Sequence, residues 1–143
     1  MAESGHRTIS GQFEELTPEH CVELLGTTTV GRVAFAGEHR IEILPVNFVY
    51  RDSAVLFRTS PHGALAVLAA GVDGVAFEVD YHDDLGQSGW SVVVSGRVEA
   101  VEDSDELAEL WSHVRPSPWA AGIRTLFLRL DPILITGRAA RRG

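Results

Sequence analysis

The stretch RIEILPVNFVYRDSAVLFRTSPHGALAV, residues 40–67, decides the expected fold. β-Branched and aromatic residues dominate its first two thirds, and the turn sequence at residues 51–53 divides them. Runs of this kind separated by a short polar turn are typical of a hairpin. The stretch therefore predicts strands over residues 41–50 and 54–59, followed by a short helix of small residues over 64–70.

The end of the second predicted strand has the residue types of an anion site. Arg58, Thr59 and Ser60 stand at its exit, and Pro61-His62-Gly63 leads into the helix. A cation, two hydroxyl groups and free backbone amides at a helix start suit a phosphate or another anion. A plain hairpin followed by a capped helix explains the same residues equally well. If His62 takes part, its protonation adds a second cation.

Strand patterns continue on both sides of this hairpin. Thr17 and Pro18 are a good N-cap and first helical residue, and Gly26 ends the helix that they begin. Asp103 and Ser104 begin a helix over 103–114 that places Trp111 on its apolar face, so we expect Trp111 in the core. Further strands are predicted over residues 30–35, 72–81, 90–101 and 123–136, the last one broken by Pro132.

Composition restricts the class of protein. The chain has 143 residues, 45% of them hydrophobic and 22% charged, which suits a single domain with a real core. The formal net charge of -8 argues against a nucleic-acid partner, because phosphate neutralisation needs clustered Lys and Arg. Cys21 is alone, and no apolar run is long enough to span a bilayer, so we expect a cytoplasmic protein.

The connections favour a mainly β fold. Most neighbouring strands are joined by only a few residues, which suits antiparallel pairing and not parallel βαβ units. The expected architecture is a six-stranded antiparallel barrel with flanking short helices. We expect a flexible lead-in at residues 1–15, the barrel domain at 16–138 and a basic tail at 139–143.

The order of these elements and several motifs resemble a known family. The chain is similar to the pyridoxamine 5'-phosphate oxidase-like split β-barrel proteins, in particular to their nitroimidazole-resistance-like branch. The matching segments are LTPEHCVELLGTTTVGRVAF (16–35), LPVNFVY (44–50), VLFRTSPHGALAVL (55–68), GWSVVVSGRVEAV (89–101) and LRLDPILITGR (128–138).

This resemblance implies a homodimer that binds flavin mononucleotide (FMN) in two grooves between subunits. The ring would lie along the strand that contains Val46 and Asn47. The partner subunit would add residues from its later half, for which Trp119 and Arg138 are candidates. The full set that the resemblance assigns to the cofactor is Val46, Asn47, Arg58, Thr59, Ser60, His62, Gly63, Ala64, Trp90 and Ser91.

One position departs from the family pattern. Relatives place a Lys near the start of the helix, and Ala64 stands there in this chain. Loss of one charge-assisted contact costs roughly 1.5–3 kcal/mol, or about one to two decades in affinity. Weak FMN binding, a deazaflavin, haem, or the loss of any cofactor all fit this substitution.

The resemblance implies a flavin-dependent oxidoreductase that acts on a small planar molecule. A non-catalytic module that stores flavin, deazaflavin or haem is the alternative, and a dimer with an empty groove is a third. No side chain needs to act as a catalytic acid or base, because the flavin itself supplies the redox chemistry, so we assign no catalytic residue. His82, Asp83 and Asp84 are predicted to form a solvated turn, so no metal site is expected.

Overall fold

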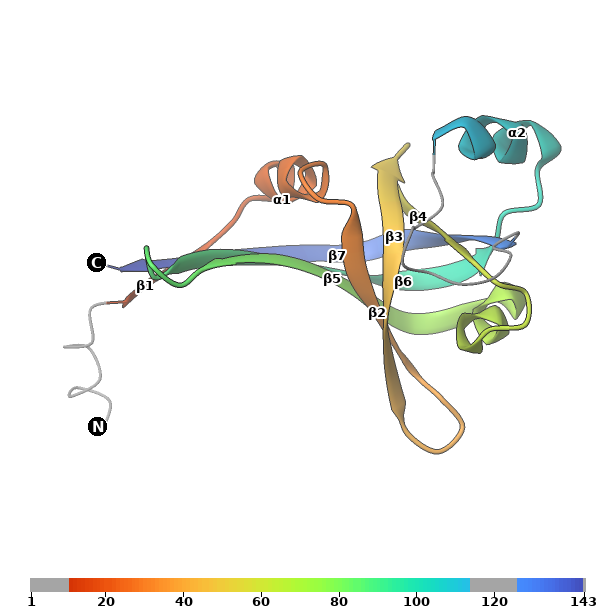
Figure 1. Ribbon diagram of the computed structural model, residues 1–143, viewed down its shortest axis with the longest axis horizontal. Coiled ribbons are helices and arrows are strands. Elements are labelled where there is room, and N and C mark those ends of the chain that lie inside the picture. The colour runs from red at the N-terminus through yellow and green to blue at the C-terminus, as the bar shows by residue number, and fades with distance from the viewer. Residues whose placement is uncertain (1–10, 114–125, 143) are drawn as a thin grey trace.

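A computed structural model describes residues 11–113 and 126–142 (Figure 1). Its sheet contains seven antiparallel strands in the order β1-β7-β4-β3-β2-β5-β6, and β6 also pairs with β7. Six of the strands therefore close into a ring, as the sequence predicts, and β1 is added outside it. The strands are β1 Gly11–Glu15, β2 Val30–Ala36, β3 Ile41–Arg51, β4 Ala54–Thr59, β5 Val72–Asp83, β6 Ser88–Ala100 and β7 Leu126–Arg142; the helices are α1 Pro18–Leu25, the 3₁₀ helix η2 Ala64–Ala70 and α2 Ser104–His113.

The barrel closes through the long pairing of β6 with β7. This pairing runs from Gly89 opposite Ala140 to Ala100 opposite Leu128, with a register shift at Ser95/Gly96. A side chain at Gly96 would overlap the carbonyl oxygen of Asp131, so only glycine allows the two strands to approach at the shift. Pro132 lies opposite Gly96, where β7 bends without ending.

Alternating side chains from all six strands fill the interior. Phe57, Phe77 and Val94 have no exposed surface, and the rings of Phe48 and Phe77 meet edge to face at 4.7 Å. Gly31 lies directly beside Phe77, where a Cβ atom would overlap the aromatic ring. The barrel is thus packed with side chains, so a ligand has to bind outside it.

Helix α1 covers the inner face of the β6–β7 extension (Figure 1). It begins as predicted, because the Thr17 hydroxyl accepts from the backbone amide of His20 at 3.1 Å. Cys21 lies on the face of α1 that packs against β7 and is fully buried. Burial raises the pKa of its thiol.

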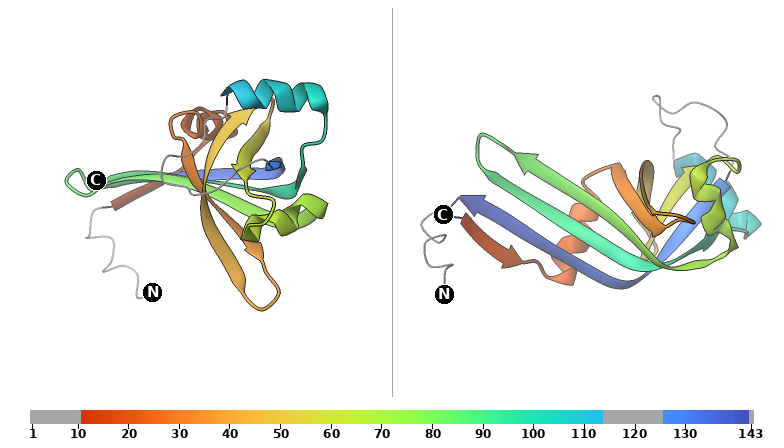
Figure 2. Two further views of the ribbon diagram at one scale, coloured as in Figure 1. Left: turned by 45° about the vertical axis from the view of Figure 1, so that its right-hand side comes forward. Right: turned by 90° about the horizontal axis from the view of Figure 1, so that it is seen from below.

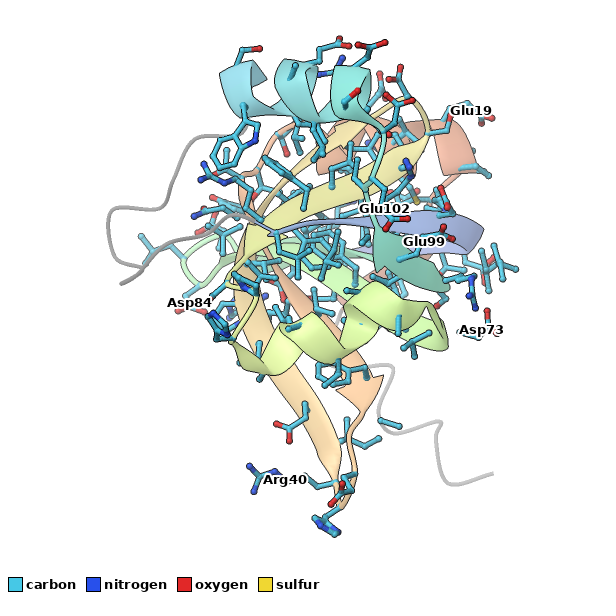
Figure 3. All side chains as sticks on the ribbon, turned by 90° about the vertical axis from the view of Figure 1, so that its right-hand side faces the viewer. Glu19, Arg40, Asp73, Asp84, Glu99 and Glu102 are labelled. Atoms are coloured by element: carbon cyan, nitrogen blue, oxygen red, sulfur yellow. The ribbon has the colours of Figure 1, made fainter. Side chains whose placement is uncertain are left out.

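The β2–β3 hairpin projects from the barrel (Figure 2). Its strands remain paired as far as Ala36 opposite Ile41, but β2 pairs with β5 only over residues 32–34. Figure 3 shows Arg40 at the outer tip of this hairpin. Ile41 and Ile43, on one face of β3, are 65% and 64% exposed. The hairpin therefore presents apolar side chains away from the barrel's own core.

The structure differs from the sequence prediction at both ends of the domain. Residues 11–15 are predicted as part of a flexible lead-in, but they form β1 and pair with residues 138–142 of β7. The predicted basic tail supplies the other half of this pairing. GQFEE has too few apolar residues for a strand pattern, and backbone hydrogen bonds to β7 hold it in place. Among the described residues, no helix is long and apolar enough to cross a membrane.

Candidate functional site

The predicted cofactor residues on β3 and β4 lie at one end of the paired strands. Phe48 pairs with Phe57, so Asn47 and Arg58 follow next to each other on the outer face of the barrel. Val46 and Thr59 point the opposite way, because side chains alternate along a strand. They are only 5% and 4% exposed, respectively. At this end the outer face therefore offers the side chains of Asn47 and Arg58, and Val46 and Thr59 can reach a ligand only through their backbones.

Thr59 is a buried polar residue at the end of β4. No described group makes a hydrogen bond with its hydroxyl. A Cβ atom added to Gly63 would lie 3.8 Å from the hydroxyl oxygen, so the turn after β4 passes close to it. An unused hydroxyl beneath this turn is compatible with a ligand above it.

The turn after β4 uses some of the amides that the sequence predicts to be free. The backbone amide of His62 donates to the Ser60 hydroxyl oxygen at 3.1 Å, and the amide of Gly63 donates to the Ser60 carbonyl at 3.1 Å. The Ser60 hydroxyl keeps its own hydrogen to donate. His62, Gly63 and Ala64 are exposed, and no described group accepts from the amide of Ala64.

The donor set at the end of β4 suits an anion. It combines the Arg58 guanidinium, the Ser60 hydroxyl and the amide of Ala64. Positively charged and neutral donors of this kind are what phosphate oxygens accept from. The residues present therefore fit the phosphate end of a flavin.

Arg58 has an aromatic neighbour that the sequence does not indicate. Its guanidinium lies 4.1 Å from the centre of the Trp111 ring and 5.5 Å from that of Phe127. Trp111 belongs to α2 and is 46% exposed, so the prediction that it lies in the core is wrong. It packs at the edge of a small cluster around Leu110 and Phe127, with one face against Arg58.

Trp90 and Ser91 lie in a different region, at the start of β6. Ser91 faces outward opposite Arg138, and Trp90 packs inward against the main core. Figures 1 and 2 place the β5–β6 hairpin at one end of the long sheet and η2 at the other. The predicted residues therefore form two groups on different strands, one on β3–β4 and one at the start of β6.

Two adjoining grooves lie beside Ser91 and Arg138. One measures about 500 Å³ and runs along β7 past Thr136, and the other measures about 410 Å³ and reaches Phe13 of β1. Arg138 and Ser91 line both grooves. Sequence reasoning names Arg138 but misses Thr136 on β7 and Phe13 on β1. Phe13 has no signal because β1 carries no strand pattern. The other predicted partner residue, Trp119, lies outside the described residues.

A charged cluster flanks the grooves on the same face. Arg32 of β2 lies 3.0 Å from the Glu78 carboxylate and 3.6 Å from that of Asp80. Burial and the nearby Asp80 raise the pKa of Glu78 to about 6, although Arg32 acts in the opposite direction. In the part of the chain that the structure describes, no group of His, Cys, Asp and Glu is arranged to hold a metal ion.

Fold and site together define a split-barrel protein whose β4 strand ends in hydrogen-bond donors of the kind that suit an anion. The family model for pyridoxamine 5'-phosphate oxidase matches residues 17–139. The chain belongs to this family, which confirms the resemblance drawn from its motifs.

Similar proteins support the same assignment. An uncharacterized protein of Mycobacterium tuberculosis is 31% identical over 127 residues, which cover 86% of this chain and 82% of that protein. The FAD binding protein from Mycobacterium smegmatis is 34% identical with a TM-score of 0.74, over 89% of this chain and 98% of that one. A FAD-binding protein from Mesorhizobium loti superposes with a TM-score of 0.80, over 92% of this chain and 99% of that one. At 24% identity, this last likeness shows the fold alone.

Proposed function

We propose that this protein binds a flavin and acts as a flavin-dependent oxidoreductase on a small planar molecule. The observation that carries the proposal is the 34% identity with a FAD binding protein of Mycobacterium smegmatis over 98% of that protein's length. The anion-type donor set at the end of β4 supports it independently, because every flavin nucleotide has a phosphate to anchor.

In this proposal, the two strands of the β3–β4 pair have separate tasks. Asn47 and the backbone of Val46 run along the flavin ring. Arg58, Ser60 and the turn through His62, Gly63 and Ala64 hold the phosphate end, with Thr59 beneath them. A bound flavin supplies the hydride-transfer chemistry, and the protein binds it, orients it and excludes water.

We propose further that the working unit is a homodimer. Trp90 and Ser91 follow the β5–β6 hairpin, which lies at the opposite end of the long sheet from η2. A second copy related by a two-fold axis can bring its β6 group, with Arg138, next to the β3–β4 group of the first. Each site would then be made by both chains.

The form of the cofactor is a separate question. FMN is the form that the family motifs imply, while the Mycobacterium smegmatis relative is a FAD binding protein. Both share the ring and the first phosphate, so the donor set at β4 serves either one. A deazaflavin presents a similar tricyclic ring and phosphate. Haem has neither a tricyclic ring nor a phosphate.

Titration of the purified protein tests the proposal. FMN, FAD and a deazaflavin are each added to flavin-free protein, and the dissociation constant is measured from flavin fluorescence. Arg58→Ala should weaken binding by about one to two decades, because it removes a charge-assisted contact. Trp111→Phe is the matched control and should stay within about twofold. Equal effects of the two variants would remove Arg58 from the site, and no binding of any flavin would refute the proposal.

A non-catalytic flavin carrier is the second candidate. Ala64 bears on whether flavin binds at all, as in a dimer with an empty groove, and not on turnover, because the exposed start of η2 has no Lys beside the phosphate. Anaerobic addition of reduced nicotinamide to the flavin-loaded protein separates the two functions. Bleaching of the flavin absorbance supports the oxidoreductase, and unchanged absorbance supports the carrier.

A further inference from the structure

The contact between Arg58 and Trp111 joins two elements that are distant in sequence. Arg58 is half-buried on β4, and its guanidinium lies 4.1 Å from the centre of the indole ring. Stacking on an aromatic face holds the plane and direction of a guanidinium. It does so without neutralising the positive charge, which a carboxylate partner would do.

The ring of Trp111 is itself held in place. It meets Phe127 of β7 edge to face, with centres 5.2 Å apart and planes at 87°. Phe127 is the cross-strand partner of Arg58, so the three side chains form one layer on the outer face of β4 and β7. The rotation of the indole is thereby restricted by the same strand pair that carries Arg58.

Helix α2 is docked on this face at several points. Glu106 accepts from both terminal nitrogens of Arg129, with contacts from 2.9 to 3.2 Å, and Glu109 pairs with Arg51. Leu110 is 1% exposed in the cluster with Leu56 and Phe127. Two acidic residues of α2 thus pair with Arg129 and Arg51, and the same helix also places the Trp111 indole against Arg58.

We propose that Trp111 is a positioning residue for cofactor binding, which holds the Arg58 guanidinium at the end of β4 in the direction that the flavin phosphate requires. The inference rests on the proposed function, since it assigns Arg58 to the phosphate. A long Arg side chain loses rotamer freedom when it binds, and prior stacking on Trp111 lowers that loss. Trp111 acts through Arg58 and need not touch the flavin.

A double-mutant cycle tests this coupling. The flavin dissociation constant is measured for wild type, Trp111→Leu, Arg58→Ala and the double variant. We expect Trp111→Leu to weaken binding about three- to tenfold in the wild-type background, and less than about twofold when Arg58 is already Ala. Trp111→Phe keeps an aromatic face and should restore binding to within about twofold of wild type.

Leu107→Ala is the control for simple loosening of α2. Leu107 packs against the same cluster, but it is not one of the aromatic residues, Trp111 and Phe127, on which Arg58 lies. This variant should lower Tm and leave the dissociation constant within about twofold. If Leu107→Ala weakens flavin binding as much as Trp111→Leu does, or if Trp111→Leu has the same effect in both backgrounds, the positioning role is refuted.

A second readout does not depend on flavin. The Nε–Hε resonance of Arg58 in the flavin-free protein should be shifted by the ring current of the aromatic side chain at position 111, both in wild type and in Trp111→Phe, and move back toward the usual range in Trp111→Leu. An unshifted wild-type resonance would overturn the inference even if flavin binds. Absence of flavin binding with a shifted resonance would instead refute the proposed function and with it the positioning role.

Discussion

Gly137 is a residue whose missing side chain sets the position of a helix. A Cβ atom there would lie 2.6 Å from the Cys21 sulfur and 3.1 Å from the Ser91 carbonyl oxygen. Helix α1 can therefore lie close to β7 only because residue 137 is glycine. The same close packing is the reason that Cys21 has no exposed surface.

We predict that Gly137→Ala destabilises the protein by about 1–3 kcal/mol, because the added methyl group overpacks this contact. Urea unfolding measures the change. Gly26→Ala is the control, since its Cβ would meet only the Glu23 carbonyl at 3.4 Å and its φ of -78° is ordinary for alanine. A Gly137→Ala protein as stable as wild type would show that α1 shifts at no cost.

Ala64 is the residue at which this chain departs from its family's pattern. We predict that Ala64→Lys tightens flavin binding by about tenfold or more, because it places a cation beside the phosphate. Fluorescence titration measures the gain. Ala70→Lys adds the same charge at the other exposed end of η2 and should change affinity by less than about twofold. Equal gains from both variants would indicate general electrostatic attraction and not a local contact.

Glu78 gives the stability of the protein a pH dependence. Its pKa in the folded state, about 6, lies above the ordinary glutamate value of 4.5. The unfolded chain therefore loses this proton first, so the Glu78 contribution to stability falls as pH rises from about 4.5 to 6 and stays reduced above that. The carboxyl is half-buried, so solvent screening keeps the effect below about 1 kcal/mol.

We predict that Glu78→Gln raises Tm by about 1–3 °C relative to wild type at pH 7.5, with a smaller difference at pH 4.5. Differential scanning calorimetry at both pH values measures it. Asp105→Gln, on the exposed first turn of α2, is a control because the Asp105 carboxylate forms no ion pair with the described residues. A Glu78→Gln variant that loses more stability at pH 7.5 than at pH 4.5 would show that the Arg32 contact outweighs burial.

Single residues also show where sequence-based prediction of the site reaches its limit. The motifs correctly identify the strands that contain Asn47, Arg58 and Ser91, but they group each residue with a neighbour that faces the core. Strand alternation separates Arg58 from Thr59 and Ser91 from Trp90. The stacking of Arg58 on Trp111 depends on how α2 docks on β4, and no local pattern contains that information.

At the scale of elements, the docking of α2 depends on two ion pairs of different strength. Glu106 and Arg129 are 33% and 24% exposed and form a bidentate ion pair. Glu109, which pairs with Arg51, is 57% exposed. Partly buried, bidentate pairs contribute more than exposed ones. The first of the two pairs therefore dominates the attachment of α2 to the barrel.

We predict that Glu106→Ala lowers the free energy of unfolding by about 1.5–3 kcal/mol, and that Glu109→Ala lowers it by less than about 1 kcal/mol. Urea denaturation of both variants gives the comparison, since they lie on the same helix three residues apart. A larger loss for Glu109→Ala would show that the exposed pair with Arg51 anchors α2.

Strands whose sequences have a strong apolar pattern are predicted well. A strand that forms mainly because its backbone pairs with a distant strand is not. The hairpin over β3 and β4 has β-branched and aromatic runs around a turn, and the structure confirms it. Strand β1 has no such pattern and exists because its backbone pairs with β7. Its side chains alone could not identify it, since the partner lies more than a hundred residues away in sequence.

At the scale of the whole molecule, the projecting β2–β3 hairpin suggests how two chains meet. Ile41 and Ile43 form an exposed apolar pair on a hairpin that leaves its own barrel. Exposed neighbouring apolar side chains of this kind commonly mark an interface. The hairpin is also continuous with Asn47 on β3, where we propose that the flavin ring lies.

We predict that the protein has twice the mass of one chain by light scattering, and that Ile41→Lys with Ile43→Lys converts it to a folded monomer. Circular dichroism checks that the fold is retained. Leu85→Lys is the control, because Leu85 is 97% exposed between β5 and β6 and lies outside both groups of proposed site residues. A wild-type monomer, or an unchanged dimer in the double variant, would rule out this interface.

Strand β7 has a consequence for the rate at which the molecule folds. It pairs with β4 through its first residues, with β1 through its last and with β6 along most of its length. Contacts between segments so far apart in sequence must wait for long loops to close, and chains rich in such contacts fold slowly. Until residues 126–142 dock, the open edges of β4 and β6 remain available to other chains, so the partly folded protein should be most prone to aggregation just before this final strand joins.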